Sequence, residues 1–176
     1  MRSAHVKVVI ERVGLASVCA LLSLGALHAV DLHAQEPLKP FAPSQNDYVL
    51  ACAGCHGLDG ASHSRVVPRL KGRAGYYLAD AEGRAYLSRL PNVAFSTLSD
   101  AQLAAVLNYI VFDLGEGSAP AGVKPYAGAE VAKWRKQPLT EVALSQYRQR
   151  VVETLIGEHH APAELRNYGD GLYGNN

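Results

Sequence analysis

Residues 52–56 read Cys-Ala-Gly-Cys-His, and no other cysteine follows residue 19 in this chain of 176 residues. Three cysteines in all exclude a disulfide-dense scaffold. A single disulfide between Cys52 and Cys55 is one possible role for the pair. A thioredoxin-type redox pair would need a surrounding βαβ pattern, and a zinc site would need a second cysteine pair. The sequence has neither feature.

Cys-x-x-Cys-His is also the attachment sequence of c-type haem. Two thiols at this spacing can add to the two vinyl groups of the porphyrin, and the adjacent histidine then reaches the iron as its proximal ligand. We therefore predict one covalently attached haem c, held by Cys52 and Cys55, with His56 as the metal ligand.

Composition and periodicity indicate an all-α protein. Hydrophobic residues make up 48% of the chain and charged residues 19%, which excludes a disordered chain. A net charge of +1 provides no basic field for nucleic acid. Apolar residues recur at helical spacing, with no alternating strand pattern. Helices are expected over residues 45–53, 81–90, 100–114, 128–137 and 140–156.

Several residues are expected to cap these helices. Ser44, Asp80 and Thr140 are candidate N-caps, and Ser99 forms a capping box with Gln102. Gly157 is expected to end the last helix.

The first 34 residues have the pattern of a signal peptide. Basic residues precede an apolar run over residues 13–27, too short for a typical membrane span. We place cleavage after Ala34, with Ala29 as second choice; an uncleaved anchor and a lipoprotein at Cys19 are the alternatives. The predicted location is the periplasm, with no membrane span in the mature chain.

The rest of the chain divides by composition. Residues 35–43 are a proline-rich linker, residues 44–116 the main domain, residues 117–160 a helical extension and residues 161–176 a flexible tail.

Three elements resemble class I c-type cytochromes. They are the helix leading into residues 52–57, the stretch Val67-Pro68-Arg69-Leu70-Lys71-Gly72, and residues 98–110, which resemble the last helix of the family. They cover about residues 44–114. The resemblance implies a cytochrome c-like helical haem cage whose first and last helices cross near Tyr48 and Tyr109. It also implies that the Pro68 carbonyl accepts the Nδ1 proton of His56, and that Arg69 and Arg73 lie near a haem propionate.

The chain departs from the family at the sixth iron ligand. Most class I cytochromes have a methionine before the last helix, but residues 90–98 contain no methionine, histidine or lysine, and Met1 is the only methionine. Export would remove Met1, so a methionine ligand is not expected. The candidates are His63, His159 or His160, or an open iron. Asn92, Tyr76 and Tyr77 are weaker candidates. Loss of the thioether would lower the reduction potential.

Two functions follow from these observations. The first is a monohaem electron carrier, not an enzyme, between a periplasmic dehydrogenase and an acceptor; family analogy suggests a quinoprotein dehydrogenase. The second is an open-site haem protein that binds or senses CO, NO or peroxide, with at most weak peroxidase-like activity. A basic cluster in the extension is either a docking surface or an ordinary solvated face. Its residues are Lys133, Arg135 and Lys136 beside Trp134, with Arg148 and Arg150 on the next helix.

Overall fold

The computed structural model describes residues 40–62, 64–140 and 142–168. Predictions for residues 1–39, His63 and residues 169–176 lie outside the described residues, so the signal peptide and its cleavage site stay predictions. All regular elements in the described part of the chain are helical, which confirms the all-α fold class. No helix in these ranges is both long and apolar enough to cross a membrane.

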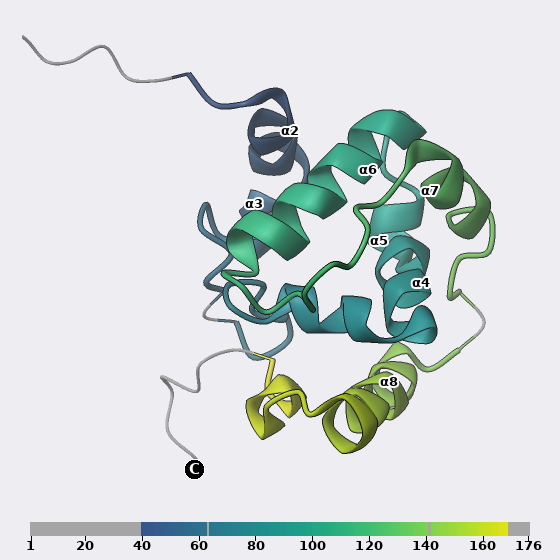
Figure 1. Ribbon diagram of the computed structural model, residues 1–176. Helices are drawn as coiled ribbons and strands as arrows, with labels where there is room; N and C mark the ends of the chain where they lie inside the picture. The colour runs from purple at the N-terminus through teal and green to yellow at the C-terminus, as the bar shows by residue number, and fades with distance from the viewer. Residues whose placement is uncertain (1–39, 63, 141, 169–176) are drawn as a thin grey trace, which may run out of the picture. The chain divides into compact units, whose positions relative to one another are not determined.

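The helices follow one another in a single compact unit, Pro40–Asn176 (Figure 1). The α-helices are α2 (Pro43–Ala51), α3 (Ala53–His56), α4 (Ala81–Arg89), α5 (Pro91–Ala94), α6 (Asp100–Asn108), α7 (Gly128–Trp134) and α8 (Leu144–His159). Between and after them lie the 3-10 helices η1 (Ala74–Ala79) and η3 (Ala163–Arg166), and the π-helix η2 (Tyr109–Leu114).

Helix α6 begins where the capping box placed it. The Ser99 hydroxyl accepts the backbone N–H of Gln102 at 3.3 Å, and the Gln102 carboxamide accepts the backbone N–H of Ser99 at 3.1 Å. The expected helix over residues 100–114 is present, but its last six residues form the π-helix η2. Asp80 caps α4, as predicted, by accepting the N–H groups of Glu82 and Gly83.

Three predicted helix ends were wrong. Helix α2 starts at Pro43 with Ala42 as N-cap, because the fixed φ of proline suits the first helical position, so Ser44 is not the cap. Helix α8 starts at Leu144 instead of Thr140 and runs through Gly157. It ends at His159, since His160 turns into the left-handed region with φ 56°.

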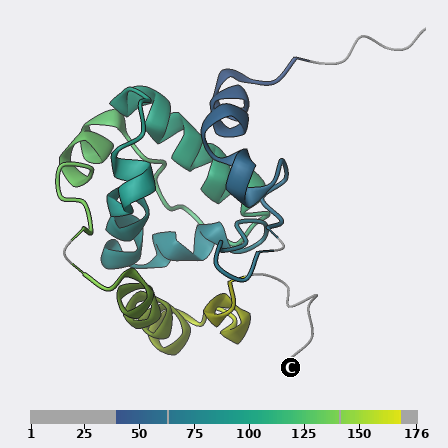
Figure 2. The same cartoon turned by 180° about the vertical axis from the view of Figure 1, so that it is seen from behind.

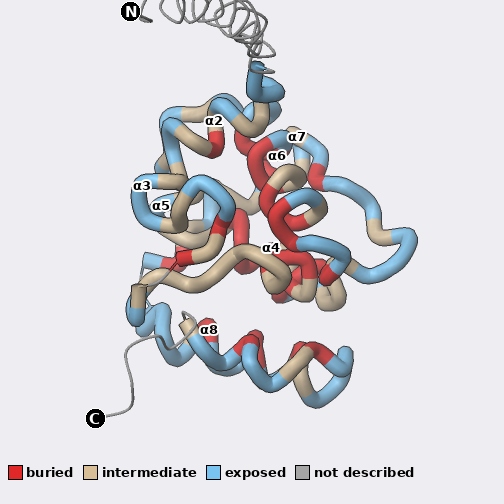
Figure 3. The backbone as a smooth tube through the Cα atoms, turned by 90° about the vertical axis from the view of Figure 1, so that its left-hand side faces the viewer, coloured by how far each residue is buried: buried red, intermediate tan, exposed pale blue. Residues whose placement is uncertain are grey.

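The core surrounds α6, against which α2 and α7 pack. Buried segments gather along α4 and α6 (Figure 3). The rings of Tyr48 in α2 and Tyr109 in η2 are 5.4 Å apart, so the first and last helices of the expected cage meet at the predicted pair.

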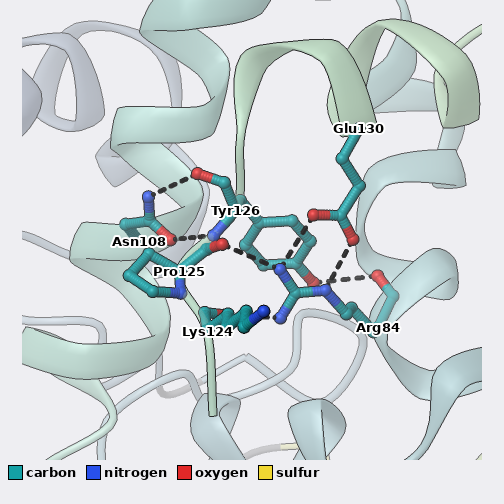
Figure 4. A network of polar contacts seen from close by, with 6 residues as sticks. All are labelled: Arg84, Asn108, Lys124, Pro125, Tyr126 and Glu130. Carbon is teal, nitrogen blue, oxygen red and sulfur yellow. Dashed lines mark hydrogen bonds and ion pairs between the residues drawn. The ribbon is translucent and has the colours of Figure 1, made fainter.

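A polar network fastens the segment before α7 to α4 and α6 (Figure 4). The Arg84 guanidinium pairs with the Glu130 carboxylate, with Nη2 2.8 Å from Oε2, and lies over the Tyr126 ring. The Asn108 side chain donates to the Tyr126 carbonyl at 3.0 Å and accepts its N–H at 2.7 Å. The first part of the extension is therefore packed into the same unit as the preceding helices.

Helix α8 packs on η1 and α4 and is followed by η3 (Figures 1 and 2). Residues 161–168 differ from the expected flexible tail, because η3 is ordered and its Leu165 is only 2% exposed. The apolar character of this single side chain was too weak a signal to predict an ordered segment.

Candidate functional site

The Cys-x-x-Cys-His segment forms one short helical turn directly after α2. The Cys52 N–H donates to the Tyr48 carbonyl at 2.8 Å, and the Cys52 carbonyl accepts the N–H groups of Cys55 and His56 at 3.2 and 3.1 Å. Gly57 ends the turn with φ 81°, a conformation that glycine adopts without steric cost. The turn places both cysteines and the histidine on one compact segment.

Both cysteines are free thiols. Cys55 is exposed, whereas Cys52 is half-buried against the core. Burial raises the pKa of the Cys52 thiol, and the neighbouring Cys55 raises it further. The pair therefore offers two sulfurs on one turn, one of them open to solvent.

The imidazole of His56 has a defined orientation. Its Nδ1 lies 2.9 Å from the carbonyl oxygen of Pro68, the contact that the family resemblance implies. A carbonyl oxygen can only accept, so Nδ1 carries the proton and Nε2 keeps its lone pair for a metal. Burial lowers the pKa of His56, although the Pro68 carbonyl opposes this effect. The ring is thus held neutral, as metal ligation requires.

The loop after Gly57 brings Pro68 back to His56. The Gly60 carbonyl accepts the N–H groups of Leu70 at 2.8 Å and Lys71 at 3.1 Å. Gly60 has φ 73°, and a Cβ there would lie 3.1 Å from the Leu70 Cβ, so a larger residue would push these two segments apart. The N–H of Gly72 donates to the Leu114 carbonyl, which ties the loop to the end of η2.

Arg69 and Arg73 lie on this loop beside the C-terminal residues. The Arg73 Nη1 is 3.5 Å from the Asn167 carbonyl, and the Arg69 Nε is 3.2 Å from the Lys71 carbonyl. Burial, followed by the charge of Arg69, lowers the pKa of the Arg73 guanidinium. A propionate contact for either arginine stays a prediction.

The segment before α6, where the family usually has its methionine, is held by Arg135. Its guanidinium donates to the carbonyls of Ala94 at 2.9 Å, Leu98 at 2.8 Å and Ser96 at 2.6 Å. It also pairs with the Asp100 carboxylate at 3.0 Å. Sequence reasoning missed this role, because nothing near Arg135 in the sequence identifies its acceptors.

The proposed docking surface therefore loses two of its members. Arg135 is occupied by the segment before α6, and the Arg148 side chain is buried. Lys133, Lys136 and Arg150 remain exposed. The Lys133 ammonium lies 4.6 Å from the centre of the Trp134 ring, which is half-buried.

His159 and His160 are exposed at the end of α8. Within the described ranges, histidine, cysteine and acidic side chains form no group of three or more that could hold a metal ion. The donor set of residues 52–56 fits a different arrangement, in which two thiols tether a haem and one neutral imidazole ligates its iron.

Two curated proteins are similar to this chain, both named cytochrome c-552 and both from Thermus thermophilus. Each is 30% identical over 118 residues, which covers 57% of this chain and 90% or 80% of the relative. No protein-family model matches the chain, and no solved structure does. The identity, its coverage of the relatives and the Cys-x-x-Cys-His turn together show that the chain belongs to the c-type cytochromes.

Proposed function

We propose that this chain carries one haem c and transfers single electrons in the periplasm between a dehydrogenase and a downstream acceptor. One observation carries the proposal. His56 lies on the same turn as two free cysteines, and its Nδ1 is 2.9 Å from the Pro68 carbonyl oxygen. Membership of the c-type cytochromes fits an electron carrier rather than an enzyme.

The residues of the turn have distinct tasks. Each thiol of Cys52 and Cys55 would add its S–H across one vinyl C=C of a haem, giving a C–S and a C–H bond without any oxidant. His56 would hold the iron through Nε2, while its Nδ1–H bond to Pro68 fixes the ring and increases its basicity. When bound, the haem supplies a one-electron ferric–ferrous couple.

Measuring whether the protein takes up covalently bound haem tests this proposal. The full chain, expressed with c-type maturation factors and exported, should contain one haem that denaturation does not release. The double variant C52S/C55S should lose covalent haem, and H56A should change the ferric and ferrous spectra. The control E158Q alters an exposed side chain on α8 that has no proposed part in haem binding. A colourless exported product, with no mass increment for porphyrin, would refute the proposal.

The fate of the leader is a separate test. The sequence predicts that the exported product begins at Gln35. N-terminal sequencing or intact mass decides between this cleavage, the cut after Ala29, a lipid-modified Cys19 and a retained anchor.

The composition of residues 90–98 favours a second candidate, an open-site haem protein that binds CO, NO or peroxide. The segment contains no methionine, histidine or lysine, and it offers no acid or base for peroxide cleavage. Rapid CO uptake by the reduced protein would support the open site. A low-spin spectrum that resists CO would indicate an internal sixth ligand, and the H159A/H160A double variant tests whether either histidine supplies it.

The charge of the exposed lysines suggests which kind of redox partner would bind. Lys133 and Lys136 form the exposed remainder of the basic cluster, and an acidic partner would be steered toward them at low salt. A K133Q/K136Q variant should be reduced more slowly by an acidic dehydrogenase, a quinoprotein being the first to try. An unaltered rate with unaltered salt dependence would rule out this surface.

A further inference from the structure

The peptide group between Pro68 and Arg69 is hydrogen-bonded on both sides. Its carbonyl accepts from His56 Nδ1 at 2.9 Å, and its N–H donates to the carbonyl of Tyr168 at 2.6 Å. Hydrogen bonds that pass through one peptide group polarise each other, so the Tyr168 carbonyl makes the Pro68 carbonyl a stronger acceptor.

Arg148 holds the residues that supply the Tyr168 carbonyl. Its Nη2 donates to the Leu165 carbonyl at 2.7 Å, its Nη1 to the Arg166 carbonyl at 3.2 Å, and its guanidinium lies 4.4 Å from the centre of the Tyr168 ring. We call residues 162–168 the C-terminal strap. Its Nη2 also lies 3.4 Å from the Asn167 carbonyl, so Arg148 contacts four successive residues of the strap.

Arg148 is one of the few charged side chains that the fold buries. The residue is 5% exposed and its Nε has no hydrogen-bond partner. Within the described residues its charge meets backbone carbonyls, the Tyr77 side chain and the Tyr168 ring, with no carboxylate paired to it. Burial of a guanidinium carries a desolvation cost, which its hydrogen bonds to the strap carbonyls offset. The group that it orders is the strap.

The strap is also fixed independently of Arg148. Leu165 is buried in the core, and the Asn167 carbonyl faces the Arg73 guanidinium at 3.5 Å. These contacts set the strap beside the loop that carries Pro68. Arg148 and Leu165 together determine where the Tyr168 carbonyl lies.

We infer that Arg148 is a positioning residue for His56: through the C-terminal strap it places the Tyr168 carbonyl on the Arg69 N–H and so strengthens the hydrogen bond from His56 to Pro68. The inference rests on the proposed function, because it assigns this tuning to the proximal ligand of a haem. A stronger Nδ1 hydrogen bond makes the imidazole a better donor to iron and lowers the reduction potential.

Two variants release the strap in different ways. R148Q removes the guanidinium, and a chain ending at Asn167 removes the Tyr168 carbonyl but keeps Arg148. Their matched controls are R150Q, on an exposed turn of the same helix, and a chain ending at Asp170. The truncation keeps the test decisive if R148Q fails to fold.

Three measurements on the haem-loaded protein decide the matter. Both variants should accelerate hydrogen exchange of the Arg69 amide by about tenfold or more, equivalent to about 1.4 kcal/mol of lost protection. They should also lower the iron–histidine stretching frequency of the ferrous protein in its five-coordinate form, or after photolysis of CO, and raise the reduction potential. The controls should leave all three readouts unchanged.

Two results would overturn the inference. Unchanged exchange at Arg69 would show that the strap does not hold this amide. Faster exchange with unaltered vibration and potential would show that the strap does not act on His56. Failure of the proposed function looks different: the wild-type chain then takes up no haem, while exchange at Arg69 still reports whether the strap is in place.

Discussion

The Arg135 guanidinium donates to the Ser96 carbonyl at 2.6 Å, although the two residues are 39 positions apart. Through this bond and those to Ala94 and Leu98, one side chain of the extension satisfies three carbonyls of the segment that precedes α6. The sequence left this cation open between a docking surface and a solvated face, and the structure makes it part of the packed core region instead.

Replacing Arg135 with glutamine should destabilise the protein. Hydrogen bonds from a charged donor are lost and partly buried carbonyls are left without partners, so we expect a cost of about 2–4 kcal/mol in the free energy of unfolding. Urea unfolding measures it. K133Q, at an exposed position of α7 just before Arg135, should change stability by less than about 0.5 kcal/mol. Equal unfolding midpoints for the two variants would contradict this role of Arg135.

Removing one hydroxyl should weaken the junction between α2 and α3. Tyr48 is fully buried, and its hydroxyl donates to the Gly57 carbonyl at 2.7 Å. Tyr48→Phe keeps the contact with the Tyr109 ring but leaves that carbonyl only the longer hydrogen bond from the Gly60 N–H at 3.3 Å, so we expect a loss of about 1 kcal/mol. Chemical unfolding of the full chain measures this loss.

Tyr76→Phe is the control for this variant, because the Tyr76 hydroxyl donates no hydrogen bond within the described residues and its ring is half-buried. If Tyr48→Phe is no less stable than Tyr76→Phe, the Gly57 contact does not contribute to stability.

Two glycine-to-alanine changes should have opposite outcomes. A Cβ at Gly75 would lie 2.3 Å from the Ala119 nitrogen and 2.7 Å from the Ser118 carbonyl carbon, so backbone must move to admit it. We expect Gly75→Ala to cost about 2 kcal/mol or more. A Cβ at Gly54 meets nothing within 4 Å, and alanine favours the helix by up to about 1 kcal/mol. In thermal unfolding, Gly75→Ala should therefore lower the melting temperature and Gly54→Ala should raise it slightly. A Gly75→Ala protein as stable as the wild type would show that Gly75 in η1 is not in close contact with Ser118 and Ala119.

The Arg84–Glu130 pair should make stability depend on pH. The hydrogen bond from Arg84 holds the pKa of the Glu130 carboxyl below its usual range, ahead of the opposing effect of burial. A carboxyl with a lowered folded-state pKa stabilises the protein above its unfolded pKa of about 4.3, and this contribution is lost as pH falls through the folded value.

Glu130→Gln should consequently be less stable than the wild type at pH 7, and the difference should shrink below about pH 4. Urea unfolding at a series of pH values checks this. Glu158→Gln, an exposed change on α8, serves as the control and should show no comparable trend. A Glu130→Gln difference that is constant from pH 7 to pH 3 would refute the assignment.

The sequence by itself determined those structural features that depend on residues only a few positions apart. The spacing of Cys52, Cys55 and His56, the capping box at Ser99 and the helical periodicity of residues 100–114 are local patterns, and each predicted its element. The meeting of Tyr48 with Tyr109 and the contact of His56 with Pro68 followed from family resemblance, and both are present.

Only the tertiary structure decided what the C-terminal extension does. Arg135 reaches back to Ser96, and the strap held by Arg148 reaches the amide of Arg69. In both cases the acceptor is a backbone carbonyl, a group that every residue carries, so no side-chain pattern marks which one will be used. From the sequence alone, a charged residue in a helix is predicted to face solvent. Only the folded structure shows whether unpaired backbone carbonyls lie close enough to accept its hydrogen bonds.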